Sequence, residues 1–179
     1  MQKSIFSILV LILWNCHSTS QKNIETNTQN SPELTKNIFN QVGADINSSV
    51  DVERMNVSEV KNLLNRIVRA DQQYRDSLNN GNKENEAFYW KKIKVNDEAN
   101  LTLLDKIVQY HGWPGISKFG EDGATTAWLI IWHHRGKRHI LCRYYNLMEK
   151  AVKNKEMHPN ALKSIDKEIA LLSPDQIEY

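Results

Sequence analysis

The residues best suited to chemistry are an aspartate and an arginine that occupy one inward-facing stripe of an expected helix. The apolar positions Leu64 and Ile67 continue at helical spacing to Asp71, which places a carboxylate on the core side. Arg75 follows four residues later, and side chains at this separation can meet on a helix. Because burying charges without partners is costly, we expect Asp71 and Arg75 to pair with groups on other helices.

His133 stands at the end of a tryptophan-rich segment and is the third candidate. Histidine is the usual general acid or base near neutral pH, and a buried aspartate can fix its tautomer. The sequence therefore predicts Asp71, Arg75 and His133 as catalytic residues of a hydrolase or lyase that acts on a small polar or anionic substrate. An alternative stays open, in which the same residues form a satisfied hydrogen-bond network in a non-catalytic binding or interaction module.

Four further residues are candidates for binding a small-molecule ligand. Gln72 lies on the shoulder of the face that carries Asp71, and two amides, Asn96 and Asn100, interrupt the apolar face of the next expected helix. Trp113 lies in the bend that follows, where it either stacks on a ligand or fills the core. We predict substrate-binding roles for Gln72, Asn96, Asn100 and Trp113.

Metals and cofactors are not indicated. His133 and His134 are adjacent, and neighbouring helical side chains project about 100° apart, so both cannot face one ion without a break in the helix. The segment from Gly120 to Gly123 lacks the spacing and the following lysine of a phosphate-binding loop. The net charge of +2 gives no reason to expect nucleic acid as a partner.

Helical periodicity runs through most of residues 57–179, which predicts an all-α domain, a compact bundle of about five helices. Ser58 is the expected cap of the first helix, and Gly112 is the expected C-terminal stop of the second. Pro114 then forces a turn. The expected helices are residues 58–80, 84–111, 123–134, 139–153 and 159–173.

The first sixteen residues have the pattern of a signal peptide. Lys3 precedes an apolar run over residues 5–14, which is too short to span a bilayer comfortably. Cys16 follows where a bacterial lipoprotein signal places its lipidated cysteine. We expect a lipoprotein held at the membrane through a lipid on Cys16, in the bacterial cell envelope. Simple secretion to the periplasm or the exterior, and an uncleaved anchor, remain as alternatives.

Residues 17–56 are rich in Ser, Thr, Asn, Gln and charged side chains. Such a composition buries too little apolar surface to offset the entropy of ordering the chain. We therefore expect a flexible, loosely structured tether with one short docking turn, followed by the helical domain at residues 57–179.

An ordered set of short motifs resembles a bacterial family known only as a domain of unknown function, over roughly residues 60–179. The matching residues are Asp71-Gln72 with Arg75, Asp97 with Asn100, Gly112-Trp113-Pro114, His133, Ala161-Leu162 with Asp166, and Tyr179. The positions that depart from the family pattern are Trp132, His134, Arg135 and Lys167. The family pattern continues with Gly-Thr-Gln after the residue that matches Tyr179, so we expect a truncated and weakened motif there. The resemblance supports the choice of positions and implies no reaction.

Overall fold

The structure is a computed structural model that describes residues 42–81 and 84–172. Within these ranges it contains helices and no strand, so the all-α prediction is confirmed. The expected signal segment, Cys16 and the motif that ends at Tyr179 lie outside the described residues. No helix within these ranges has the length and apolarity needed to cross a bilayer.

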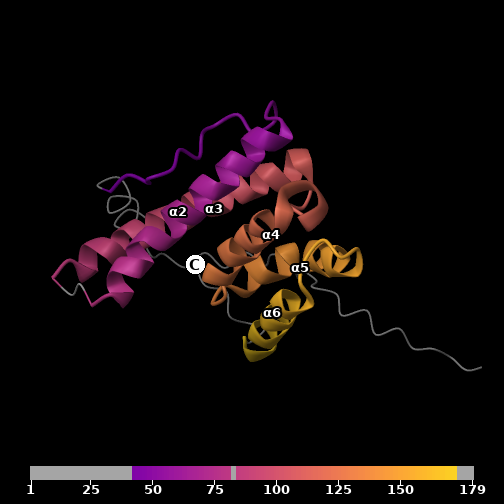
Figure 1. The fold of residues 1–179 in the computed structure, drawn as a ribbon. Helices are drawn as coiled ribbons and strands as arrows, with labels where there is room; N and C mark the ends of the chain where they lie inside the picture. The colour runs from indigo at the N-terminus through magenta and orange to yellow at the C-terminus, as the bar shows by residue number, and fades with distance from the viewer. Residues whose placement is uncertain (1–41, 82–83, 173–179) are drawn as a thin grey trace, which may run out of the picture.

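Two long antiparallel helices, α2 (Val57–Asn79) and α3 (Glu86–His111), lie side by side and form one layer of the bundle (Figure 1). The predicted cap of α2 at Ser58 is wrong, because Asn56 caps the helix. The Asn56 side chain accepts from the backbone N–H of Glu59 at 3.1 Å, and the Glu59 carboxylate accepts from the backbone N–H of Asn56 at 2.7 Å. This reciprocal pair satisfies two N–H groups that the start of the helix would otherwise leave free.

The turn after α3 follows the prediction, but the next helix begins earlier than expected. Gly112 ends α3 with a φ of 79°, a backbone conformation that favours glycine. Helix α4 then runs over Ile116–His133 and is kinked at Gly120, where φ is 81°. The turn before the kink buries Phe119, which is 4% exposed. The sequence analysis assigned this short turn to the loop, because Gly120 interrupts the helical periodicity of its apolar residues.

Helix α4 packs against both α2 and α3 and is the central element of the bundle (Figure 1). Helices α5 (Arg138–Lys153) and α6 (Pro159–Leu171) pair with each other, and α5 joins them to α4. The core contains fully buried side chains from α2 to α6, including Leu63, Leu64, Ile67, Leu103, Leu104, Ile107, Ile130, Ile131, Leu141, Met148 and Ile165.

Residues 42–56 pack along α3, which differs from the loose tether predicted for this stretch. Ile46 and Val52 are 4% and 1% exposed. The Lys106 ammonium donates to the Ser48 carbonyl at 2.8 Å, and His111 Nε2 donates to the Val52 carbonyl at 2.7 Å. Two apolar anchors and these hydrogen bonds therefore hold a segment that is polar on average.

Candidate acid–base site

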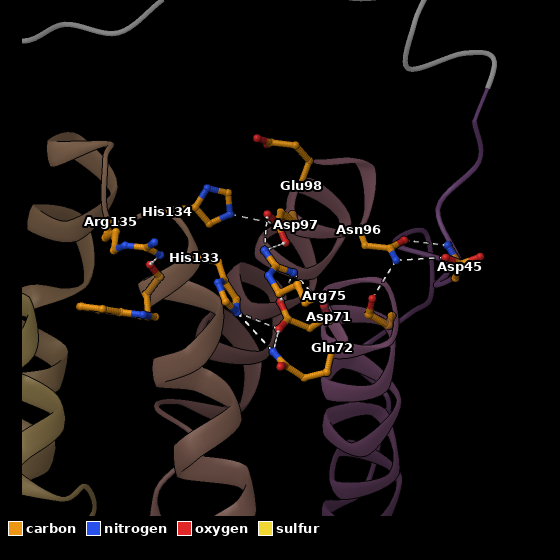
Figure 2. Close-up of polar contacts among 12 residues, drawn as sticks. Asp45, Asp71, Gln72, Arg75, Asn96, Asp97, Glu98, His133, His134 and Arg135 are labelled. Atoms are coloured by element: carbon orange, nitrogen blue, oxygen red, sulfur yellow. Dashed lines mark hydrogen bonds and ion pairs between the residues drawn. The ribbon is translucent and has the colours of Figure 1, made fainter. Parts of the chain in front are cut away.

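Asp71 and His133 meet where α2 faces α4 (Figure 2). His133 Nε2 lies 3.0 Å from Asp71 Oδ2, and the two side chains are 13% and 1% exposed. Asp71 reaches this position because the apolar stripe of α2 continues to it, and His133 because it is the last residue of α4. An ionised carboxylate can only accept hydrogen bonds, so a hydrogen bond at this contact requires a hydrogen on Nε2 of the ring.

Gln72 shares the same carboxylate oxygen. Its Nε2 donates to Asp71 Oδ2 and lies 3.3 Å from His133 Nε2. The Gln72 NH₂ group has two hydrogens, so it can donate to His133 Nε2 as well when that nitrogen is unprotonated. With a hydrogen on His133 Nε2, both nitrogens are donors to Asp71, and the 3.3 Å separation is then only a close contact. Gln72 thereby flanks His133 on the side of the carboxylate.

Arg75 links α2 to α3 through a second carboxylate, Asp97. Arg75 Nη1 donates to the Asp71 carbonyl at 2.7 Å and lies 3.4 Å from Asp71 Oδ1. Arg75 Nη2 lies 2.8 Å from both carboxylate oxygens of Asp97. The guanidinium is therefore shared between two carboxylates, and it approaches Oδ1 of Asp71 whereas His133 approaches Oδ2 (Figure 2).

Asp97 was not among the predicted site residues, although it starts the motif that ends at Asn100. The only available signal was its place one turn before Asn100 on the inward face of α3. Burial raises the pKa of Asp97, and the nearby negative charge of Asp71 adds to this rise, whereas Arg75 lowers the pKa. The net rise shows that burial disfavours the charge on Asp97 more than Arg75 stabilises it.

His134 adds a contact from the end of α4 to α3. It is 4% exposed, and its Nε2 lies 3.4 Å from the Asp97 carbonyl, to which it donates. Burial lowers the pKa of His134, so the folded protein favours the neutral ring. The sequence analysis assigned His134 no role and argued against a metal site there, whereas the structure gives it a hydrogen-bonding role.

Solvent reaches the edge of the cluster and not its centre. The side chains of Arg75 and Asp97 are 17% and 14% exposed, whereas the Asp71 side chain is 1% exposed. Within the described residues His133 Nδ1 has no hydrogen-bond partner, and it is not among the atoms that are both buried and unpartnered. Nδ1 is therefore the nitrogen of His133 that contacts solvent.

Asn96 does not join this cluster. Its Oδ1 accepts from the Asp45 backbone N–H at 2.9 Å, and its Nδ2 donates to the Ala70 carbonyl at 2.8 Å. Figure 2 shows Asn96 directed toward Asp45 and away from His133. Asn96 thus connects α2, α3 and the docked segment 42–56, a role that its buried position in the sequence pattern could not specify.

Asn100 and Trp113 also make no hydrogen bond to the cluster in the part of the chain that the structure describes. Asn100 is fully buried, and both of its amide atoms lack a partner there. Trp113 packs against the hydrophobic core, and its buried Nε1 is likewise unpartnered within the described ranges. The structure therefore unites Asp71, Gln72, Arg75 and His133 and leaves the other predicted residues outside this network.

The cluster offers proton transfer rather than metal ligation. Among the described residues, no three His, Cys, Asp or Glu side chains form a group that could hold a metal ion. A histidine held by a buried aspartate, with its second nitrogen at the solvent edge, can accept or release a proton.

Comparisons of the chain with protein-family models, with curated proteins and with solved structures found no match. The resemblance to a domain of unknown function therefore stays a prediction, and the function rests on the residues themselves.

Proposed function

We propose that the protein is an enzyme of the cell envelope in which His133 moves a proton to or from a small polar substrate. The contact between Asp71 Oδ2 and His133 Nε2, at 3.0 Å, carries this proposal. This contact supports the tautomer in which Nε2 bears a hydrogen and Nδ1 offers a lone pair. His133 then acts first as a general base through Nδ1, on a water molecule or on an acidic proton of the substrate.

The other members of the cluster position His133 and compensate its charge. When Nδ1 takes a proton, the ring becomes a cation, and the adjacent Asp71 carboxylate stabilises it. Arg75 acts as a positioning residue, because it holds Asp71 and Asp97 together and makes its contacts within the protein. Both a hydrolase and a lyase begin with a proton abstraction of this kind.

The charge balance favours a neutral polar substrate over an anionic one. The cluster of Asp71, Asp97, Arg75 and His133 has a formal charge of −1 when His133 is neutral. Its formal charge is zero when His133 is protonated. The guanidinium is already shared by two carboxylates, so an incoming anion would have to compete with both of them. The sequence was compatible with a polar or an anionic substrate, and these contacts support a neutral polar substrate.

The location of the enzyme is also a proposal. The pattern of residues 1–16 supports export, with a lipid on Cys16 as the link to the membrane. Nothing in the net charge of +2 supports a nucleic-acid partner.

The test uses the full chain and two matched histidine variants. His133→Gln keeps a donor toward Asp71 but removes the ring that accepts the proton, and His139→Gln changes an exposed histidine. Each protein is incubated with a panel of neutral and anionic polar compounds, and products are followed by proton NMR. We expect turnover of a neutral compound by the wild type and by His139→Gln, and none by His133→Gln. Equal turnover by all three proteins would rule out the proposed role of His133.

A second function is favoured by one specific observation, the near-complete burial of the Asp71 side chain at 1% exposure. A sealed and fully bonded carboxylate suits a network that fixes the packing of three helices. The protein would then be a non-catalytic cell-surface binding or interaction module. In that case no compound is turned over, and His133→Gln lowers stability without any other effect.

A further inference from the structure

Asn100 is a buried amide with no partner from the described chain. It is 0% exposed, and neither Oδ1 nor Nδ2 has a hydrogen bond among the described residues. Nearly all buried polar side-chain atoms in proteins are satisfied, and an unpaired amide costs on the order of 1–3 kcal/mol. An amide with both a free donor and a free acceptor therefore points to a group that binds there.

The position of Asn100 places this amide in the interior of the bundle. Asp97 is three residues earlier on α3, so the two side chains share one face of the helix. Leu103 and Leu104, on the next turn, are 0% exposed. Asp97, on this face, contacts Arg75 of α2 at 2.8 Å, and α3 also packs against α4, so the face that carries Asn100 looks into the bundle.

Asn96 provides an internal comparison, because it is also 0% exposed and lies one turn away on the same helix. Its amide bonds to the Asp45 backbone at 2.9 Å, the Asp45 carboxylate at 3.0 Å and the Ala70 carbonyl at 2.8 Å. The fold thus supplies partners for one buried amide and not for the other. This contrast sets Asn100 apart from a side chain that only fixes helix register.

We propose that Asn100 forms an internal subsite for one small neutral group that both donates and accepts a hydrogen bond. A hydroxyl or amide of a bound ligand has this chemistry, and so does a single water molecule. The environment disfavours an anion, because Arg75 is committed to Asp71 and Asp97 and a buried negative charge needs a partner. The subsite does not depend on proton transfer by His133.

The direct test is a crystal structure of the full chain, compared with Asn100→Leu and Asn96→Leu. In the wild type and in Asn96→Leu we expect electron density of a bound group within hydrogen-bonding distance of both Asn100 amide atoms. In Asn100→Leu we expect no bound group at the same place. Solvent extraction of the wild type followed by mass spectrometry distinguishes a bound organic ligand from a water molecule. A released organic compound identifies a ligand group, and single-atom density without such a compound identifies water. An Asn100 amide surrounded only by carbon atoms would overturn the proposal.

Thermal unfolding gives the same answer without crystals. If Asn100 has a bound partner, Asn100→Leu loses those hydrogen bonds, and the Tm stays equal or falls. If the amide is simply unsatisfied, an apolar side chain of similar size relieves it, and the Tm rises by roughly 2–4 °C. Such a rise would overturn the subsite, whereas Asn96→Leu should lower the Tm in either case.

Discussion

Replacing Asp71 with asparagine tests the cluster with the least change of shape. Three donors converge on this carboxylate: His133 Nε2 at 3.0 Å, Gln72 Nε2, and Arg75 Nη1 at 3.4 Å. Asparagine keeps one accepting oxygen and replaces the other with an NH₂ group, which is itself a donor. The substitution therefore removes the negative charge. It also places an NH₂ donor against at least one of the three donor groups, which then loses its hydrogen-bond acceptor.

The expected loss of stability follows from the number and burial of these contacts. Hydrogen bonds to charged groups contribute about 1.5–3 kcal/mol each, and breaking a buried ion pair costs about 3–5 kcal/mol. Arg75 keeps Asp97 as a partner, so it is not left unpaired. We therefore expect Asp71→Asn to lower the free energy of unfolding by about 3 kcal/mol. A domain with the usual stability of about 5–15 kcal/mol stays folded after this loss.

The assay is urea unfolding followed by far-UV circular dichroism and by intrinsic tryptophan fluorescence, to which Trp128 and Trp132 on α4 contribute two of the five tryptophans. Asp76→Asn is the matched control, because Asp76 lies on the same helix with an exposed side chain. The control should change the free energy of unfolding by less than about 0.5 kcal/mol. If Asp71→Asn also costs less than about 1 kcal/mol, the carboxylate does not bind the three donors.

Three further changes test other parts of the structure. Arg75→Lys should lower the free energy of unfolding by about 2 kcal/mol, because a single ammonium cannot hold the Asp71 carbonyl and both oxygens of Asp97. Burial holds the pKa of His134 below its ordinary value of 6.5, so acid favours the unfolded chain, and stability should fall as pH drops below about 6.5. His134→Gln should reduce that fall between about pH 7.5 and 5.5, as measured by urea unfolding. Asp45→Ala removes the contacts with Lys92 at 2.9 Å and with the Asn96 amide at 3.0 Å. The docked segment should open about fivefold more often, which trypsin cleavage at the exposed Arg54 would report.

Each of these predictions has a control at an exposed position. Arg69→Lys should leave stability unchanged, and an equal loss for Arg69 and Arg75 would refute the bridging role of Arg75. His139→Gln should keep the wild-type pH dependence, and His134→Gln must differ from it. Ser49→Ala, at an exposed position of the same segment, should leave cleavage at Arg54 slow, and similar cleavage of the Asp45 and Ser49 variants would show that Asp45 does not hold the segment.

The helices and the inward position of Asp71 were predictable because helical periodicity reports burial directly. The stripe from Leu64 through Ile67 leads to Asp71, and the four-residue spacing to Arg75 predicted the contact that the structure contains. Gly112 also marked the end of α3, because its φ of 79° favours glycine. Local rules of this kind depend only on the sequence nearby.

What could not be predicted depends on packing between helices. Asn96 and Asp97 are adjacent and differ by about 100° on α3, so only the placement of α2 and α4 decides which one faces Arg75. The docking of segment 42–56 likewise depends on distant partners, Lys106 and His111, and its local composition resembles a loose tether. The sequence analysis therefore selected Asn96 and not Asp97 as a site residue, because it could not determine which of the two faces Arg75.

The most direct measurement is the proton on the His133 ring, observed by NMR of the full chain labelled with ¹⁵N-histidine. A hydrogen bond from Nε2 to Asp71 predicts a downfield ring proton that exchanges slowly with water. This signal should vanish in Asp71→Ala, which has no side-chain oxygen to accept the bond. The exposed His139 ring should show no such signal in either protein. A His133 ring proton that exchanges as fast as that of His139, or a slowly exchanging one that persists in Asp71→Ala, would contradict the pairing on which the proposed chemistry depends.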